Sequence, residues 1–337
     1  MINFKRYFHS HFKANIKPLI CILIAVLVLT FLIGINEQPD AYYDYQTGIS
    51  TSYYKSTLYV PVIFLSILAY VLPVMEFSFF KKRINLDCAY SLPISRRCMG
   101  AVHYLTGIII LFISFTSSYI LNFILLLTRG SGWFNFSPMI AHYFLCIILG
   151  FAMYSTMVFV FNEGNTMGDG IWFMLLYSFV LVVITSALEQ ITNLNIFIDT
   201  FAGIPWGTIS IITESYQNLV ELKSNRPFGY FDEPRYIFWF VFWIAAGIAS
   251  CIGFFLTFGK RRMELTEEIS DSYFGFRTLI PIYAISGMLT FQDTDVIIFC
   301  VIIQLLALLG YTIYRRGFHY KKSDIAFLLI ALVCIFI

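Results

Sequence analysis

The chain has 337 residues, of which 59% are hydrophobic and 12% are charged, and it contains 36 Phe and 22 Tyr. This composition excludes a soluble globular domain, and we expect an integral membrane protein. The net charge of +2 says little by itself, because in a membrane protein the distribution of Lys and Arg between loops matters more than their sum. We expect no nucleic-acid partner. The seven cysteines form no CxxC pair, so they indicate neither a disulfide framework nor a zinc site.

The N-terminal segment, residues 1–17, has the pattern of an interfacial helix. Phe4, Phe8 and Phe12 recur every four positions, so they share one face of a helix while basic side chains lie on another. We therefore expect this helix to lie flat in the membrane interface. The apolar run at 19–35 is too long for the apolar region of a signal peptide, and no small-x-small cleavage site follows it, so we interpret it as a retained span.

The apolar runs predict an all-α, polytopic membrane protein. A bilayer core of about 30 Å needs roughly 20 helical residues. The candidate spans are 19–35, 57–75, 102–127, 138–161, 171–188, 236–258, 278–291, 296–314 and 325–337. The first six would form a core over residues 18–258, followed by a linker at 259–277 and additional membrane segments in 278–337. The last run could reach only about 20 Å, so we favour a span that continues in a longer protein over a half-span.

Residues 189–235 contain a further apolar stretch, 196–212, which Gly203-Ile-Pro-Trp-Gly207 breaks midway. If the N-terminus is cytoplasmic and this stretch does not cross, few of the 22 basic residues lie outside: Lys55, Arg129, Lys223, Arg226 and Arg235. This distribution fits the positive-inside rule. We therefore expect a re-entrant hairpin packed against other spans near the outer surface. A surface loop is the alternative.

The predicted spans offer little chemistry, because they contain essentially no ionisable residue and so predict no proton relay. His9 and His11 are two residues apart and point to different faces of a helix, so no metal site is expected. The stretch GFFLTFGKR, residues 253–261, lacks the second Gly and the Ser or Thr of a nucleotide-binding loop. The chain would therefore have no ATPase activity of its own. We also expect it to contain no catalytic residue and to bind no cofactor. A lipid-modifying enzyme would need paired acidic residues at the membrane interface, and Glu163 with Asp169 is the only nearby candidate pair.

A charged, proline-marked segment, RINLDCAYSLPISRR, lies inside a predicted cytoplasmic loop of residues 76–100. Asp87 could cap a short helix whose apolar side includes Leu86, and Pro93 would end or bend it. Basic residues on both sides would hold it at the headgroup layer: Lys81, Lys82, Arg83, Arg96 and Arg97. These features predict a short amphipathic rod, parallel to the membrane, that offers a handle to a partner.

This segment resembles the coupling-helix region of permease subunits of type 2 ATP-binding-cassette (ABC) exporters, in particular the clostridial and bacillar group that uses a separate ATPase subunit. The resemblance rests on Leu86-Asp87 followed by Ser91-Leu-Pro-Ile-Ser-Arg96 between the second and third spans. The N-terminal interfacial helix, the expected re-entrant hairpin, and the stretches 261–264 and 270–277 are similar to the same group. The similarity covers most of residues 1–280, and the additional C-terminal segments depart from the six-span pattern.

The resemblance implies a bacterial plasma-membrane permease with a cytoplasmic N-terminus. It would pair with a second permease, identical or related, within membrane lipids, and with two cytosolic ATPase subunits that bind ATP and Mg. The chain would couple ATP hydrolysis to export of a substrate such as a peptide, lipid or antibiotic. The expected ATPase-coupling residues are Arg83, Leu86, Asp87, Tyr90, Ser91, Leu92, Pro93, Ile94, Ser95 and Arg96.

Two further groups of site residues follow from the same interpretation. Glu163 and Asp169, between the fourth and fifth spans, would offer a second ATPase contact, with a simple tight turn as the alternative. The re-entrant turn would consist of Gly203, Pro205, Trp206 and Gly207. A function of another class is also open at this point: a membrane sensor or scaffold that binds a cytosolic signalling partner without transport.

Overall fold

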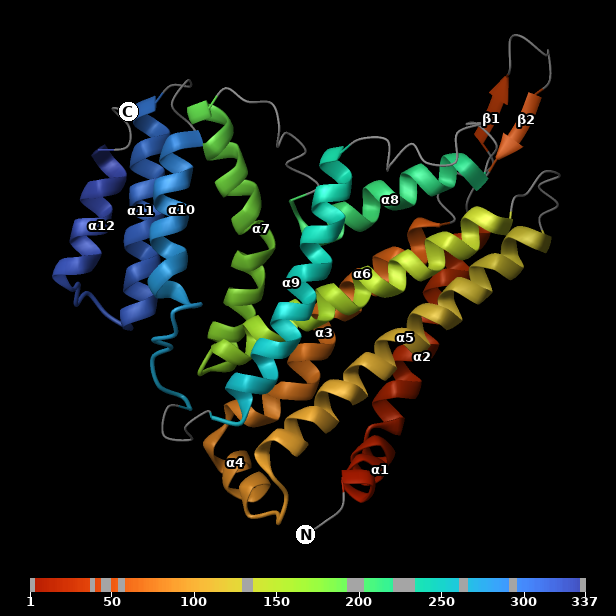
Figure 1. Cartoon of the computed structure of the whole chain (residues 1–337), viewed down its shortest axis with the longest axis horizontal. Helices are drawn as coiled ribbons and strands as arrows, with labels where there is room; N and C mark the ends of the chain where they lie inside the picture. Colours follow the sequence, from red (N-terminus) through yellow and green to blue (C-terminus); the bar gives the residue numbers. More distant parts are fainter. Residues whose placement is uncertain are drawn as a thin grey trace. The chain divides into compact units, whose positions relative to one another are not determined.

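The computed structural model describes residues 4–36, 40–43, 50–53, 58–128, 136–192, 203–220, 234–260, 266–290 and 296–333. Within these ranges the protein is helical apart from one antiparallel hairpin of short strands, β1 (Asp40–Tyr43) and β2 (Ser50–Tyr53), in which Asp40 pairs with Tyr53. The helices and the hairpin are shown in Figure 1. The predicted all-α class is therefore confirmed for the bulk of the described chain.

The chain divides into two compact units that are discontinuous in sequence. Unit 1 contains Met1–Glu76, Pro93–Thr156 and Trp206–Ala249, and unit 2 contains Phe77–Leu92, Met157–Pro205 and Ser250–Ile337. This division by packing cuts through the six-span core that the sequence predicts, because the chain passes from one unit to the other within single helices.

Unit 1 is built from α1 (Phe4–Ala14), α2 (Ile16–Asn36), α3 (Tyr59–Phe77), α5 (Arg96–Thr128), the first part of α6 (Phe136–Glu163), α8 (Pro205–Val220) and the first part of α9 (Pro234–Phe258). Helix α5 is its long central element, and both α1 and α2 pack on it. Thr30 and Ser118 share a 2.8 Å hydrogen bond between their hydroxyl oxygens where α2 meets α5. Such hydroxyl contacts join helices where no water competes.

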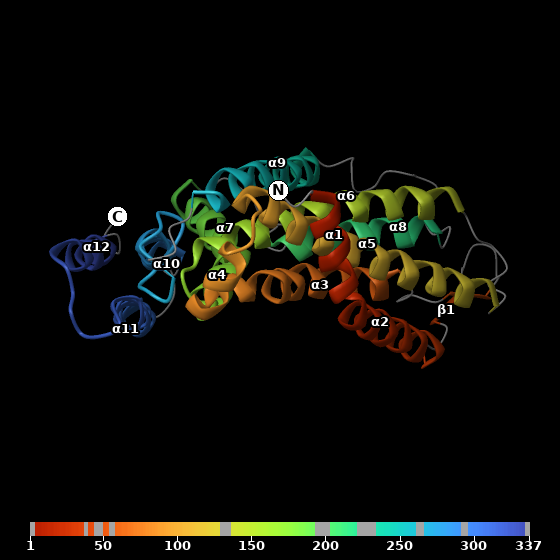
Figure 2. The same ribbon diagram turned by 90° about the horizontal axis from the view of Figure 1, so that it is seen from below.

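Unit 2 contains a 3₁₀ turn, η1 (Ser78–Lys81), followed by α4 (Arg83–Tyr90), α7 (Met167–Thr192), α10 (Phe276–Thr290), α11 (Val296–Arg315) and α12 (Lys322–Val333). Helix α10 packs on α7 and also contacts α11 and α12 (Figure 1, Figure 2). Arg315, at the end of α11, forms a 3.1 Å ion pair with Asp324 in the first turn of α12. This buried pair fixes the connection between the last two helices.

Six helices of the described chain are long and apolar enough to cross a membrane: Ile16–Asn36, Tyr59–Lys81, Arg96–Thr128, Ser137–Glu163, Met167–Thr192 and Ile237–Phe258. They coincide with the first six predicted spans, although the third extends further at its N-terminal end. The additional segments are present as α10, α11 and α12, and residues 334–337 of the last run lie outside the described residues. The protein is thus a multi-pass, α-helical membrane protein.

The predicted N-terminal helix is present as α1, and its position in the membrane interface stays a prediction. Helix α1 ends at Ala14, before α2 begins at Ile16. The rings of Phe4 and Phe8 stack at 6.2 Å between centroids, and those of Phe8 and Phe12 at 5.9 Å. Pro18 lies in the first turn of α2, where its missing N–H removes no helical hydrogen bond.

Candidate functional site

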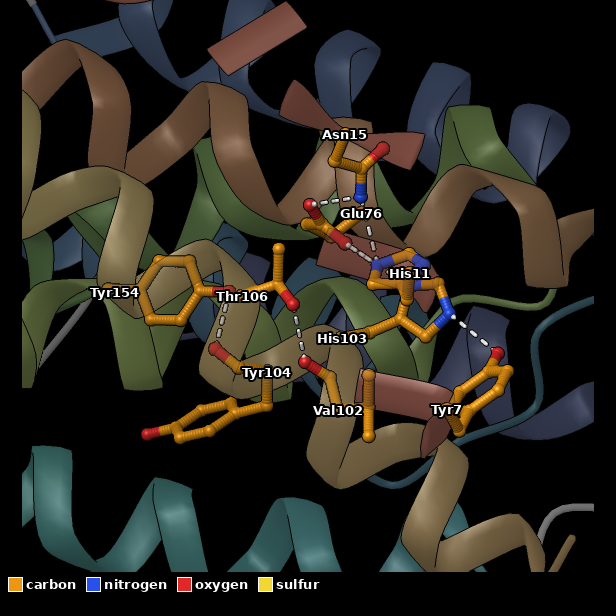
Figure 3. A network of polar contacts seen from close by, with 9 residues as sticks. All are labelled: Tyr7, His11, Asn15, Glu76, Val102, His103, Tyr104, Thr106 and Tyr154. Atoms are coloured by element: carbon orange, nitrogen blue, oxygen red, sulfur yellow. Dashed lines mark hydrogen bonds and ion pairs between the residues drawn. The ribbon is translucent and has the colours of Figure 1, made fainter. Parts of the chain in front are cut away.

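Three ionisable side chains from three helices meet inside unit 1 (Figure 3). His11 comes from α1, Glu76 from the end of α3 and His103 from the second turn of α5. The Glu76 Oε2 atom lies 3.0 Å from His11 Nε2 and 3.1 Å from His103 Nδ1. All three side chains are largely buried, with exposed fractions of 15% for His11, 5% for Glu76 and 8% for His103. One carboxylate oxygen is therefore shared by two imidazole rings away from solvent.

Tyr7 of α1 and Asn15, the residue directly after α1, complete this cluster. Tyr7 Oη lies 3.5 Å from His103 Nε2, and Asn15 Nδ2 donates to Glu76 Oε1 at 3.3 Å. Tyr7, His11 and Asn15 follow one another at four-residue spacing, so the helix presents all three side chains on one face. Burial raises the pKa of Tyr7, and Cys98 and Glu76 raise it further. The phenol therefore stays protonated.

The hydrogen bonds of the cluster are not all satisfied by an anionic Glu76 with neutral histidines. His11 Nε2 faces both Glu76 Oε2 at 3.0 Å and Asn15 Nδ2 at 2.9 Å. If Nε2 carries a hydrogen, it opposes the Asn15 amide group; if it carries a lone pair, it opposes the carboxylate. Turning the Asn15 amide would place its oxygen against Glu76 Oε1. A proton on Glu76 Oε2 removes this conflict, because Glu76 then donates to the lone pair of His11 Nε2. A metal ion at the same place would also occupy that lone pair, and the Asn15 amide would keep Glu76 Oε1 as its acceptor.

The expectation that the spans hold essentially no ionisable residue was wrong. Glu76 and His103 lie inside the spans Tyr59–Lys81 and Arg96–Thr128. Sequence reasoning missed Glu76 because α3 continues beyond residue 75, where the predicted span ends. His11 was compared only with His9, whereas its partners are 65 and 92 residues away. The four-residue spacing of Tyr7, His11 and Asn15 was a usable signal, because it places three polar side chains in one row along the helix, next to the row of phenylalanines.

A second buried histidine in unit 1 provides a contrast. His142 in α6 has its Nδ1 atom 3.1 Å from Tyr119 Oη and its Nε2 atom 3.1 Å from Thr213 Oγ1. Cys146 Sγ lies 3.3 Å from the same Nε2 atom. Each ring nitrogen thus meets a hydroxyl group that can both donate and accept, and no carboxylate of the described residues contacts the ring. His142 is a satisfied structural histidine.

The predicted coupling residues lie partly on α4 and partly on the segment before α5. Arg83, Leu86, Asp87 and Tyr90 belong to α4, where the Tyr90 side chain lies outside the described residues. Ser91, Leu92 and Pro93 follow the helix and are exposed. Ile94 is half-buried, Ser95 accepts from the Cys98 amide at 3.3 Å and so caps α5, and Arg96 begins that helix.

Two details of the predicted rod were wrong. Asp87 does not cap a helix, because α4 already begins at Arg83 and Asp87 is the fifth residue of its eight. Leu86 is 3% exposed and packs inward, so it is not part of an outward apolar surface. Among the described side chains of α4, residues 83–87, the outward apolar residue is Ile84, which is 82% exposed. The helix ends at Tyr90, three residues before Pro93, as the proline favours.

Lys81 was expected at the headgroup layer, and this expectation was wrong. Its side chain is buried, and its Nζ donates to the backbone oxygens of Phe161 at 2.9 Å, of Asn162 at 3.2 Å and of Gly164. These carbonyls end α6, where the helix leaves its last carbonyls without partners. The ammonium group therefore caps α6 and complements the negative end of its dipole.

Glu163 and Asp169 flank a short turn between α6 and α7, and both carboxylates have partners within unit 2. Ser272 donates to Glu163 Oε2 at 2.6 Å, and Ser270 donates to Asp169 Oδ2 at 2.7 Å. In the turn, a Cβ atom at Gly164 would lie 2.5 Å from the backbone nitrogen of Gly170, so only glycine fits. The two acids attach the segment after α9 to this turn, and residues 261–264 of the predicted similarity lie outside the described residues.

The predicted re-entrant turn is only partly a turn. Gly203 and Ile204 form it, but Pro205, Trp206 and Gly207 are the first residues of α8. Proline is well suited to this first helical position because its fixed φ angle matches the helix. One side of α8 is buried, with Thr208, Ile209, Ile212 and Thr213 inaccessible to solvent. The rest of the predicted stretch, residues 196–202, lies outside the described residues.

The fold and the buried cluster together define a class: a polytopic helical membrane protein with an ionisable site inside its helices. Comparison of the chain with protein families, with curated proteins and with solved structures finds no match.

Proposed function

We propose that this chain is the permease subunit of a type 2 ABC exporter, with α4 as the helix that receives movement from a separate ATPase. The observation that carries the proposal is the two-sided character of α4. Its inner side is anchored in unit 2, whereas Ile84 projects outward and is 82% exposed. A short helix that directly follows a span and is fixed on one side is suited to transmit force from a partner.

The anchoring of α4 supports this role. Arg83 Nε donates to the Thr266 carbonyl oxygen at 2.9 Å, and its Nη2 lies 3.4 Å from Glu268 Oε1. The preceding turn η1 places Lys81 against the last carbonyls of α6. Within unit 2, a displacement of α4 therefore acts on the end of α6 and on the segment after α9. In the proposed assembly, ATP and Mg²⁺ bind the two ATPase subunits, and a second permease completes the translocation path.

The contact surface differs from the one that the sequence suggested. Ile84 and Leu92 are exposed apolar residues among the described side chains of residues 83–94, with exposed fractions of 82% and 39%. Leu86 instead holds α4 to its own unit. The proposed ATPase contact is therefore centred on Ile84 and Leu92, and Leu86 has a supporting role.

Replacing Ile84 by aspartate is expected to reduce ATPase recruitment at least tenfold, equivalent to about 1.4 kcal/mol. An exposed apolar anchor at the centre of an interface loses its contact when it becomes charged. The measurement is purification of the tagged full chain from native membranes. An ATPase that carries a nucleotide-binding loop is then identified and quantified by peptide mass spectrometry.

Phe318→Asp is the matched control, because Phe318 is 81% exposed in unit 2 but lies between α11 and α12. It should leave ATPase recruitment and membrane insertion unchanged. Equal ATPase recovery with Ile84→Asp and the unmodified chain would overturn the proposal. Recovery of a signalling kinase instead of an ATPase would support the sensor or scaffold function.

A further inference from the structure

We propose that His11, Glu76 and His103 bind a divalent transition-metal ion, of which Zn²⁺ is the best match, and that the ion fastens α1 to α3 and α5. Two imidazoles and one carboxylate are a common zinc-ligand set that leaves a fourth position for water. The site is independent of the proposed transport function. It is a metal site that needs residues from three separate parts of unit 1.

The ligand atoms have the right spacing for one ion. His11 Nε2, Glu76 Oε2 and His103 Nδ1 all lie within 4.8 Å of one another, and the carboxylate oxygen is 3.0 Å and 3.1 Å from the two nitrogens. Zinc bonds of about 2.0–2.1 Å in tetrahedral geometry place ligand atoms about 3.3 Å apart. The two oxygen–nitrogen distances are already close to this spacing, and an ion could bind all three atoms once the two nitrogens adjust towards it.

The residues around the three ligands have the roles expected of an outer shell. A histidine that binds a metal through one nitrogen usually donates from the other. With His103 Nδ1 on the ion, its Nε2–H donates towards Tyr7 Oη, 3.5 Å away. Asn15 Nδ2 donates to Glu76 Oε1, the carboxylate oxygen that is not shared by the two rings. Each of these contacts orients a ligand.

The geometry favours a metal over a purely structural polar cluster. The two histidine rings are 3.9 Å apart between centroids, and each directs one ring nitrogen towards the same carboxylate oxygen. A cation accepts both lone pairs at once and neutralises Glu76. The buried His142 of the same unit contacts hydroxyl groups, and within the described residues it meets no carboxylate and no second histidine.

The test uses the full chain with a tag that contains no histidine, purified in detergent without a metal-affinity column. The protein is treated with EDTA, given one equivalent of Zn²⁺ and desalted, and the retained zinc is measured by mass spectrometry. The unmodified chain should retain one ion per chain. His11→Ala and Glu76→Gln should retain less than about one tenth of that amount, because each removes a direct ligand.

His9→Ala is the matched control on the same helix, and His142→Gln is the control for a buried histidine. Both should retain zinc like the unmodified chain. As a measurement that needs no variant, Co²⁺ bound to the unmodified chain should give the intense visible absorption of tetrahedral coordination. Failure of the unmodified chain to retain zinc, or equal retention in every variant, would overturn the proposal.

Stability measurements distinguish a bound metal ion from a protonated Glu76 in the same cluster. Zn²⁺ should raise the unfolding temperature of the unmodified chain and leave that of Glu76→Gln unchanged. If the cluster instead holds a protonated Glu76, Glu76→Gln without metal would match the stability of the unmodified chain, and zinc would have no effect on either. That result would also overturn the metal proposal.

Tyr7→Phe tests the outer shell, because it removes only the hydroxyl group beside His103. It should weaken zinc affinity about tenfold, within the range typical of outer-shell residues. The affinity is measured by competition with a chromophoric zinc chelator, and Tyr42→Phe, in β1 of the same unit, is the control. An unchanged affinity in Tyr7→Phe would show that His103 does not bind the ion through Nδ1.

Discussion

Replacing Lys81 by methionine is expected to destabilise the folded protein by at least about 3 kcal/mol. Methionine fills a similar volume but donates no hydrogen bond, so the carbonyls of Phe161, Asn162 and Gly164 lose a charged donor in a buried place. The dipole of α6 also loses its compensating charge. The effect is measured as the shift in the unfolding transition of the purified chain, and as the loss of monodisperse protein in size-exclusion chromatography.

Lys82→Met is the matched control, since it removes the same charge from the neighbouring residue, which is exposed. Its free energy of unfolding should stay within about 0.5 kcal/mol of that of the unmodified chain. A Lys81→Met protein that unfolds together with this control would contradict the assignment of Lys81 as the cap of α6.

Replacing Gly247 by valine is expected to cost about 3 kcal/mol or more, because an added side chain here cannot be accommodated by a rotamer change. A Cβ atom at Gly247 would lie 2.5 Å from the Cα atom of Ala152. The neighbour is backbone, so α9 must move away from α6 within unit 1. Small residues at such crossings let membrane helices approach closely. We expect a large fall in folded yield and in unfolding temperature.

Gly168→Ala provides the comparison, since its added Cβ atom would have only the Thr166 hydroxyl nearby, at 3.9 Å. This substitution in the first turn of α7 should be neutral or slightly stabilising, because alanine has less conformational freedom in the unfolded chain. If both glycine variants behaved alike, close packing of α6 and α9 would not explain the effect at Gly247.

The two proposals concern different units and can be tested separately. Ile84 and its anchoring residues lie in unit 2, whereas the three metal ligands lie in unit 1. Loss of zinc binding in Glu76→Gln therefore tests only the metal site and not ATPase recruitment. Loss of ATPase recruitment in Ile84→Asp likewise tests only the ATPase contact and not the metal site. Measuring both properties on both variants shows whether the sites are energetically coupled.

Much of the fold could be predicted because membrane spans are encoded locally. Every backbone polar group in a span must be satisfied within the helix, so a long apolar run gives the position of a helix without knowledge of its neighbours. Ile16–Asn36 and Met167–Thr192 were found in this way. The four-residue spacing of phenylalanines likewise predicted α1, because the period of a helix is a local property.

The ends of helices were predicted less well, since they depend on partners that sequence windows do not contain. Helix α3 runs on to Phe77, and Lys81 turns inward because the carbonyls at the end of α6 require a donor. Asp87 looked like a cap, but Arg83 is held by Thr266 and Glu268 and α4 begins there. Contacts between residues more than 180 positions apart decided that boundary.

The sequence by itself determined that this is a helical membrane protein, where its six long spans lie, and that a short charged helix follows the second of them. Hydrophobic length and period are sufficient for this, because each span satisfies its own backbone. The cluster of His11, Glu76 and His103 was decided only by the tertiary structure. Each residue alone is an ordinary polar side chain, and the shared oxygen arises only when α1, α3 and α5 pack together and exclude water.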